Sequence, residues 1–173
     1  MGQGDEARQG DPNEPGYREG AGADSVKQHI DNDGRRRTGE RATLGLARGD
    51  HTVLVVDDIL TTRYATSRGL RAAGFKVVEA AGGAEALERT AGVAAVVLDV
   101  HLPDIDGFEV CRLLRAAPGT QTLPVVHVSS VFVSNEHRLR SVESGANAYL
   151  VAPVVHSDLA DMMDRLLRKA AEA

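Results

Sequence analysis

Short runs of aliphatic residues alternate with helix-length stretches along the chain after residue 50. The runs are rich in β-branched residues and occupy residues 52–56, 75–78, 94–98, 124–128 and 148–151. Because they lack polar alternation, they predict strands that are buried on both faces of a parallel sheet. The stretches that follow the runs predict helices over residues 61–73, 84–90, 107–116, 135–144 and 157–170.

Five strands, each followed by a helix, predict a (βα)5 domain of the α/β class. Right-handed crossovers place helices on both faces of the sheet, which gives a doubly wound, flavodoxin-like architecture with a five-stranded parallel sheet. In this architecture ligands bind outside the carboxyl ends of the strands. The residues that directly follow the predicted strands are therefore the first candidates for a functional site.

The first 50 residues differ in composition from the rest of the chain. They are rich in glycine and charged residues and contain few clustered aliphatic residues. Such a segment buries too little apolar surface to offset the entropy lost on ordering, so we predict a disordered tail over residues 1–50. We predict a folded domain over residues 51–170 and no output domain after it, as in a single-domain protein.

Composition and charge argue against several classes of function. The formal net charge of -5 argues against a nucleic-acid-binding surface, which needs a basic field. Cys111 is the only cysteine, so neither an internal disulfide nor a cysteine-rich metal site is expected. No apolar run approaches the roughly 20 residues needed to cross a bilayer, and the start of the chain lacks the apolar region of a signal peptide. We therefore expect a cytoplasmic protein that binds neither nucleic acid nor membrane.

Three acidic residues lie at the predicted carboxyl ends of strands. Asp57 and Asp58 follow the first strand, and Asp99 follows the third. The first and third strands can be neighbours in a doubly wound sheet, which would bring the three carboxylates together to hold Mg²⁺. Without a cation they would repel, so we expect at least one raised pKa. The alternative is that each is a turn or helix-capping residue, as Asp104 is expected to be.

Asp99 is the best candidate for a nucleophile toward a phosphoryl group. A carboxylate beside a divalent cation can attack phosphorus, and the turn at residues 101–107 directly follows Asp99 and can wrap the site. Ser129 and Ser130 end the fourth predicted strand, where a hydroxyl can donate to a phosphoryl oxygen. Taken alone, a serine after a strand is more often a helix cap, but the position beside the other strand ends favours the site.

Four motifs occur in order at these strand ends. They are Val-Leu-Val-Val-Asp-Asp at 53–58, Asp-Val-His-Leu-Pro-Asp-Ile-Asp-Gly-Phe at 99–108, Pro-Val-Val-His-Val-Ser-Ser at 124–130 and Gly-Ala-Asn-Ala-Tyr-Leu-Val-Ala-Pro at 145–153. With these motifs the chain from about residue 51 to residue 169 resembles the receiver domains of response regulators in two-component systems. Any single motif is weak evidence, whereas four in order are highly specific.

The resemblance implies a role for each matching residue. Asp99 would accept a phosphoryl group from a phosphohistidine on a histidine kinase or a phosphotransfer protein. Mg²⁺ would lie near Asp57, Asp58 and Asp99, with the backbone carbonyl of His101 as a further ligand. Ser129 matches the switch hydroxyl and Tyr149 the switch aromatic of the family. The resemblance also implies a cis peptide bond before Pro153.

One departure from the family concerns the residue before Pro153. Receiver domains normally carry a lysine there, which pairs with the acceptor carboxylate and then with the phosphoryl group, and this chain has Ala152. His101 and His156 are candidates to supply a charge, although each is expected to be a solvent-facing or turn residue.

Two functions remain open from the sequence. The intact acidic residues favour a phosphorylation switch that signals to an unknown protein target. The resemblance implies that the signalling face is formed by the fourth helix, the fifth strand and the fifth helix. The missing lysine favours a pseudo-receiver, an interaction module that does not switch by phosphorylation. A metal-dependent enzyme is disfavoured because no separate general acid or substrate pocket is evident.

Overall fold

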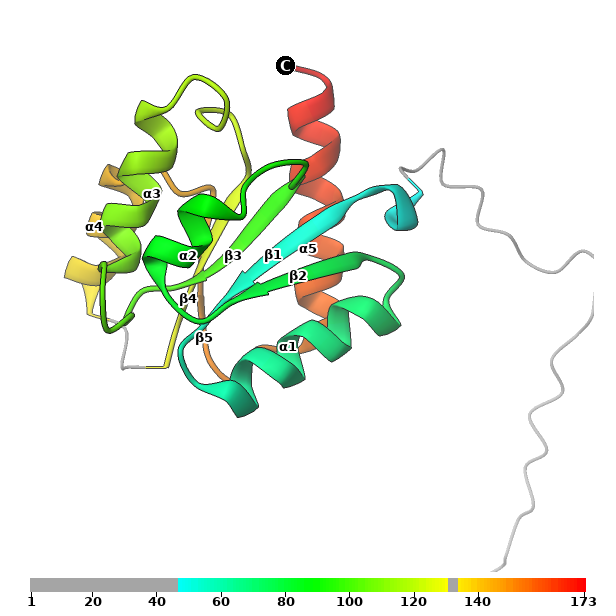
Figure 1. Ribbon diagram of the computed structural model, residues 1–173, viewed down its shortest axis with the longest axis horizontal. Helices are drawn as coiled ribbons and strands as arrows, with labels where there is room; N and C mark the ends of the chain where they lie inside the picture. Colours follow the sequence, from blue (N-terminus) through cyan, green and yellow to red (C-terminus); the bar gives the residue numbers. More distant parts are fainter. Residues whose placement is uncertain (1–46, 131–133) are drawn as a thin grey trace, which may run out of the picture. The chain divides into compact units, whose positions relative to one another are not determined.

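The computed structural model describes residues 47–130 and 134–173, and these residues form a parallel sheet with helices on both faces (Figure 1). The sheet has five strands in the order β2-β1-β3-β4-β5. The predicted doubly wound fold is therefore confirmed. The strands are β1 Thr52–Val56, β2 Lys76–Ala80, β3 Ala95–Asp99, β4 Val125–Ser129 and β5 Ala148–Val151.

Two groups of helices cover the two faces of the sheet. Helices α1 and α5 cover one face, while α2, α3 and α4 cover the other (Figure 1). The helices are α1 Leu60–Ala72, α2 Gly83–Glu88, α3 Gly107–Ala116, α4 Asn135–Glu143 and α5 His156–Ala171. No helix in the described part of the chain is both long and apolar enough to span a membrane.

The central strands are aliphatic throughout because each contributes to two cores. Val53 and Val55 of β1 pack with Leu159 and Met163 of α5 on one face of the sheet. Leu54 and its neighbours pack on the other face with residues of α2 and α3. Alternate residues of a strand point to opposite faces, so both sets must be apolar, and this explains the continuous runs in the sequence.

Some of the helix ends follow from local sequence. Gly74 directly after α1 has a φ of 104°, a left-handed conformation that favours glycine. The Asp106 side chain caps α3 by accepting a hydrogen bond from the Phe108 N–H at 2.8 Å. Helix α5 begins at His156, one residue before the predicted start, and its capping residue Val155 makes no side-chain hydrogen bond.

The packed structure begins slightly before the predicted domain start at residue 51. Arg48 lies in a 3-10 turn, Arg48–Asp50, and its guanidinium pairs with Asp164 of α5 at 2.6 Å. It also donates to the backbone carbonyl of Ala73 at 3.1 Å and lies 5.4 Å from the centre of the Phe75 ring. The remainder of the predicted tail, residues 1–46, lies outside the described residues, as does the segment 131–133.

Candidate functional site

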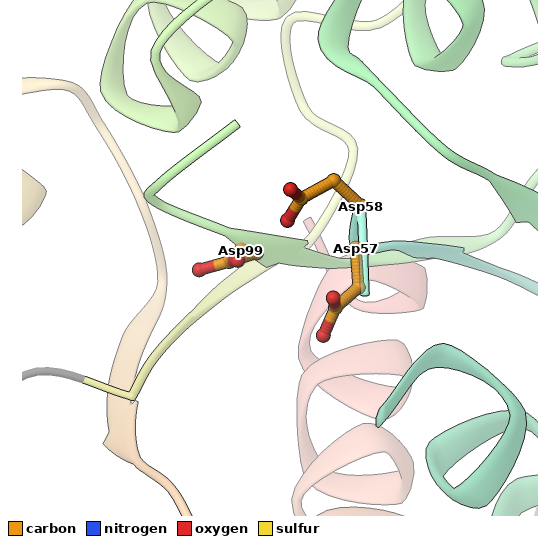
Figure 2. Close-up of side chains that lie close together, drawn as sticks. All are labelled: Asp57, Asp58 and Asp99. Carbon is orange, nitrogen blue, oxygen red and sulfur yellow. The ribbon is translucent and has the colours of Figure 1, made fainter. Parts of the chain in front are cut away.

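The three acidic residues singled out in the sequence lie together at the carboxyl ends of β1 and β3 (Figure 2). These two strands are neighbours, with Val56 paired to Leu98, so the residues that follow β1 lie beside the end of β3. One carboxylate oxygen from each of Asp57, Asp58 and Asp99 lies within 4.8 Å of the others. An all-oxygen set of this kind suits a hard divalent cation such as Mg²⁺, with water completing the shell.

Burial and mutual repulsion disfavour the charged forms of these carboxylates. The pKa of Asp57 is raised to about 6, mainly because the carboxyl group is buried. The nearby carboxylates of Asp99 and Asp58 raise it further, whereas a hydrogen bond from the Ile59 N–H lowers it. The pKa of Asp99 is also raised, again mainly by burial. The predicted rise is confirmed, but desolvation contributes more than repulsion. A cation in this pocket would favour both charged forms.

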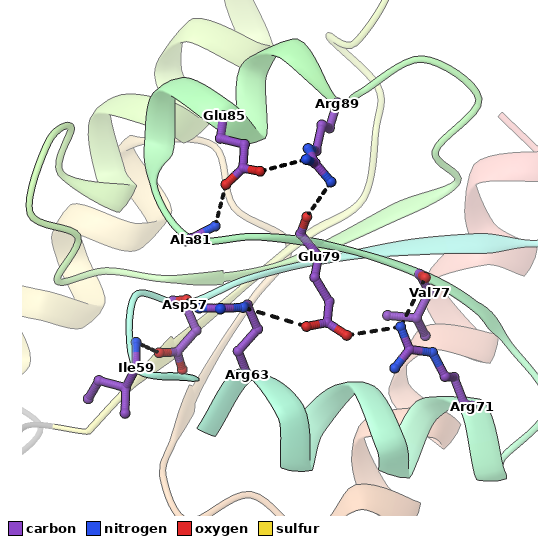
Figure 3. A network of polar contacts seen from close by, with 9 residues as sticks. All are labelled: Asp57, Ile59, Arg63, Arg71, Val77, Glu79, Ala81, Glu85 and Arg89. Carbon is purple, nitrogen blue, oxygen red and sulfur yellow. Dashed lines mark hydrogen bonds and ion pairs between the residues drawn. The ribbon is translucent and has the colours of Figure 1, made fainter. Parts of the chain in front are cut away.

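Arg63 fixes the turn that carries the acidic pair, a role that the sequence reasoning missed. Its guanidinium donates to the backbone carbonyl of Asp57 at 2.5 Å and pairs with Glu79 on β2 at 3.5 Å (Figure 3). Arg71 holds the other side of the Glu79 carboxylate at 2.9 Å. The charge of Arg63 is thus shared between Glu79 and the Asp57 carbonyl. In the sequence, only the position of Arg63 in the first turn of the helix that follows Asp57 hints at this contact.

The loop after Asp99 is held in place by its own side chains. The Asp99 carboxylate accepts a hydrogen bond from the His101 N–H at 3.1 Å, which orients this carboxylate. Asp104 accepts from the N–H groups of Gly83 and Ala84, each at 2.8 Å. These bonds lower the pKa of Asp104 to about 2. Asp104 is therefore a helix cap, as expected, but it caps α2 rather than the helix that follows it.

Glycine is required at position 107 because the chain there passes very close to the backbone of Asp99. A Cβ there would collide with the carbonyl oxygen of Asp99 and with the Cα of Val100. The Gly107 N–H donates to the carbonyl of Val100 at 3.0 Å and closes the loop. The loop over residues 101–107 can therefore follow this path only because residue 107 has no side chain.

The two predicted switch residues lie on the neighbouring strands. Ser129 is the last residue of β4 and is buried, and β4 pairs with β3 through Asp99 and Val128. Tyr149 lies on β5 opposite His127 and is partly exposed. Its hydroxyl is buried and has no hydrogen-bond partner in the described part of the chain. The switch roles of both residues remain predictions.

Ala152 brings only a methyl group to the end of β5. Its N–H donates to the carbonyl of Ser129 at 2.8 Å, and the following bond to Pro153 is cis, as the resemblance implied. Of the two histidines considered as replacements for the lysine, His101 is exposed and its charge would lower the pKa of Asp99. The ring of His156 instead packs against Gly69 of α1.

Comparisons with known proteins agree with this geometry. The sequence profile of the response regulator receiver domain matches residues 53–164. The transcriptional regulatory protein PrrA of Mycobacterium leprae is 39% identical over 119 residues, which are 68% of this chain and 50% of PrrA. The transcriptional regulatory protein CusR of Escherichia coli K12 is 33% identical over 121 residues, 69% of this chain and 52% of CusR. The chain thus spans about half the length of these curated relatives.

Solved structures give the same picture. A CheY-like receiver domain protein from Methanospirillum hungatei superposes with a TM-score of 0.65 at 25% identity, covering 70% of this chain and 97% of that one. The BeF3-activated DrrB receiver domain superposes with a TM-score of 0.62 at 27% identity, covering 68% of this chain and 97% of that one. Receiver domains are signalling modules rather than conventional enzymes. The fold, the acidic cluster and these matches together show that this chain belongs to the response regulator receiver domain family.

Proposed function

We propose that this chain is a phosphoacceptor of a two-component system or phosphorelay, with Asp99 as the acceptor. The observation that carries the proposal is the convergence of three carboxylate oxygens within 4.8 Å of one another at the ends of β1 and β3. The partner is a histidine kinase or a phosphotransfer protein, and we place both in the cytoplasm. Asp57, Asp58, Asp99 and the backbone carbonyl of His101 would hold Mg²⁺.

The transfer is a displacement at phosphorus. An ionised oxygen of Asp99 attacks the phosphorus of the partner's phosphohistidine, a P–O bond forms, and the P–N bond breaks with its electron pair on the imidazole nitrogen. Asp57, Asp58 and Asp99 would hold Mg²⁺ beside the reacting group, where the ion would supply positive charge to offset the negative charge of the phosphoryl oxygens. The hydrogen bond from the His101 N–H holds the Asp99 carboxylate in place. Gly107 leaves room for the loop beside the acceptor.

The signal would leave through the surface of α4, β5 and α5. A phosphoryl group adds roughly −1.5 to −2 charge, toward which the hydroxyl of Ser129 would move, followed by a change of Tyr149. The exposed apolar residues Leu139, Val142 and Val155 lie on α4 and just before α5, where a partner protein could cover them. We propose signalling by protein–protein contact, without nucleic-acid binding by the domain itself.

A pseudo-receiver is the second candidate, and Ala152 is the observation that favours it. Loss of a charge-assisted hydrogen bond typically costs about 1.5–3 kcal/mol, enough to weaken both phosphorylation and its readout. In that case the fold and the acidic pocket remain, and the domain binds its partner in one fixed state.

Phosphorylation by a small phosphodonor separates the two candidates. The full chain is incubated with acetyl phosphate and Mg²⁺, and the intact mass is compared for wild type, Asp99→Asn and Ala152→Lys. A Mg²⁺-dependent gain of one phosphoryl group that is absent in Asp99→Asn supports the switch. Labelling of Ala152→Lys but not of wild type supports the pseudo-receiver. If neither wild type nor Ala152→Lys is labelled, Asp99 is not a working acceptor.

A further inference from the structure

Helix α4 has an unusual distribution of polar and apolar residues. Its most buried residues are Ser141 and the capping residue Ser144, each 2% exposed. Its aliphatic residues Leu139 and Val142 are 58% and 71% exposed. Most helices in proteins are held by an apolar face that packs on the core. Helix α4 must therefore be held in another way.

The inward face of α4 meets a buried histidine on β4. His127 is completely buried, and its Nδ1 lies 2.8 Å from the hydroxyl oxygen of Ser141, a hydrogen bond whose direction depends on the tautomer. Its ring packs nearly perpendicular to that of Phe108 of α3, with the ring centres 5.1 Å apart. Either tautomer of the neutral ring can bond to a hydroxyl, which both donates and accepts.

A second, more exposed set of contacts lies above this pair. Arg140 of α4 lies 4.5 Å from the centre of the Phe108 ring and 3.5 Å from the carboxylate of Asp106. His137 stacks on the same ring, with centres 6.3 Å apart. The side chains of Arg140 and Asp106 are 41% and 47% exposed, so water can replace their contact if α4 moves. Water has no such access to the pair formed by His127 and Ser141.

The buried pair is therefore the contact that resists displacement of α4. A hydrogen bond depends steeply on distance and angle, whereas apolar packing tolerates sliding. A buried polar atom that loses its partner also carries the full penalty of its desolvation. His127 lies two residues before Ser129, so both side chains point to the same face of β4.

We propose that the hydrogen bond between His127 and Ser141 is a latch that holds α4 on β4, and that occupation of Asp99 is linked to its release. The linkage rests on the proposed phosphoacceptor function, whereas the latch itself does not. Where a leucine would only exclude water, this histidine ties the position of α4 to the strand that carries Ser129.

Amide hydrogen exchange of the full-length unphosphorylated chain tests the latch. Ser141→Ala leaves the buried imidazole without its partner, and we expect exchange in residues 135–143 to become about tenfold faster, with the strands unchanged. The double variant His127→Leu/Ser141→Ala removes both polar groups, so its α4 should exchange within about threefold of wild type.

Ser67→Ala is the matched control. Ser67 is a buried serine on α1 whose hydroxyl has no hydrogen-bond partner in the described part of the chain. Its removal should leave exchange in α4 unchanged. The latch is refuted if Ser141→Ala exchanges like wild type, or if the double variant opens as readily as the single one.

Binding of beryllofluoride with Mg²⁺, a mimic of the phosphoryl group, tests the linkage. If release of α4 and occupation of Asp99 are coupled, Ser141→Ala should bind the mimic about tenfold more tightly than wild type. Equal affinities alongside altered exchange would overturn the linkage. If no variant binds the mimic, the phosphoacceptor function fails, and the exchange experiment still decides whether the latch exists.

Discussion

The carboxylate of Asp104 accepts a hydrogen bond from the backbone N–H of Gly83 at 2.8 Å, across 21 residues of sequence. The loop that follows β3 therefore caps α2, the helix that follows β2. We expect Asp104→Ala to lower the free energy of unfolding by about 1 kcal/mol, the usual loss for a helix cap, and Asp104→Asn to lower it by less. Urea denaturation measures both changes.

The same contact makes the stability of the folded chain depend on pH in the acidic range. The pKa of Asp104 is about 2 in the folded chain and about 3.8 in the unfolded chain. The ionised carboxylate therefore contributes fully to the stability of the fold above pH 3.8, and this contribution is lost as the pH falls toward 2. Asp104→Ala should lack this part of the acid destabilisation. If the difference in stability between wild type and variant is the same at pH 3 and pH 6, the ionised form of Asp104 contributes nothing beyond what an uncharged cap provides.

The close approach of Gly107 to the backbone carbonyl of Asp99 predicts a severe effect of one added methyl group. Gly107→Ala should lower the free energy of unfolding by about 3 kcal/mol or displace Asp99, because the new Cβ collides with backbone atoms that cannot yield cheaply. Gly119→Ala is the control, since a Cβ there meets nothing within 4 Å. Denaturant titration compares the two variants, and similar losses would contradict the prediction.

The clamp formed by Arg48 and Asp164 predicts where the chain can be shortened. A chain that starts at Arg48 should keep the stability of the full chain, whereas Arg48→Ala should lower it by about 1–2 kcal/mol through loss of a partly buried ion pair. Arg68→Ala is the control, since Arg68 is exposed and makes no ion pair among the described residues. An Arg48→Ala variant as stable as Arg68→Ala would show that the clamp is inert.

The buried imidazole of His127 predicts a second dependence on pH. Burial lowers its pKa from 6.5 to about 4, with Arg115 contributing in the same sense, whereas the Gly107 backbone and Asp106 oppose the change. The neutral ring therefore stabilises the folded chain above pH 6.5, and this contribution is lost as the pH falls from 6.5 toward 4. At pH 5 the loss is roughly 2 kcal/mol.

Comparison with His127→Leu/Ser141→Ala isolates this effect from that of the carboxylates. Asp57 and Asp99 have raised pKa values, so their protonation stabilises the chain as the pH falls, and both proteins share this gain. Urea denaturation at pH 7 and pH 5 should show a larger loss for wild type than for the double variant. Parallel losses would mean that His127 is not protonated on unfolding.

The strands and the acidic pocket could be predicted because their causes are local. A strand buried on both faces must be aliphatic throughout, so β1 is evident from residues 52–56 alone. The carboxyl ends of parallel strands meet at one edge, so the positions of Asp57 and Asp99 in the sequence already indicate their proximity.

The remaining features depend on contacts between distant residues. His127 lies in an aliphatic strand, and nothing near it in the sequence shows that Ser141 provides its hydrogen bond. Likewise, Arg48 falls in the segment predicted to be disordered, and its partner Asp164 lies 116 residues later. A pattern of apolar positions describes what is buried, but it does not describe which polar groups are buried together.

The position of Arg48 also determines where a reporter can be attached. Arg48 precedes the amino end of β1, and the five residues of that strand separate it from the end that carries the carboxylates, a distance of about 17 Å. A fluorescent protein fused before Arg48 thus joins the domain at the edge of the sheet opposite Asp99. Such a fusion leaves the proposed acceptor Asp99 open to a phosphodonor and makes motion of α4 measurable by energy transfer to a dye on that helix.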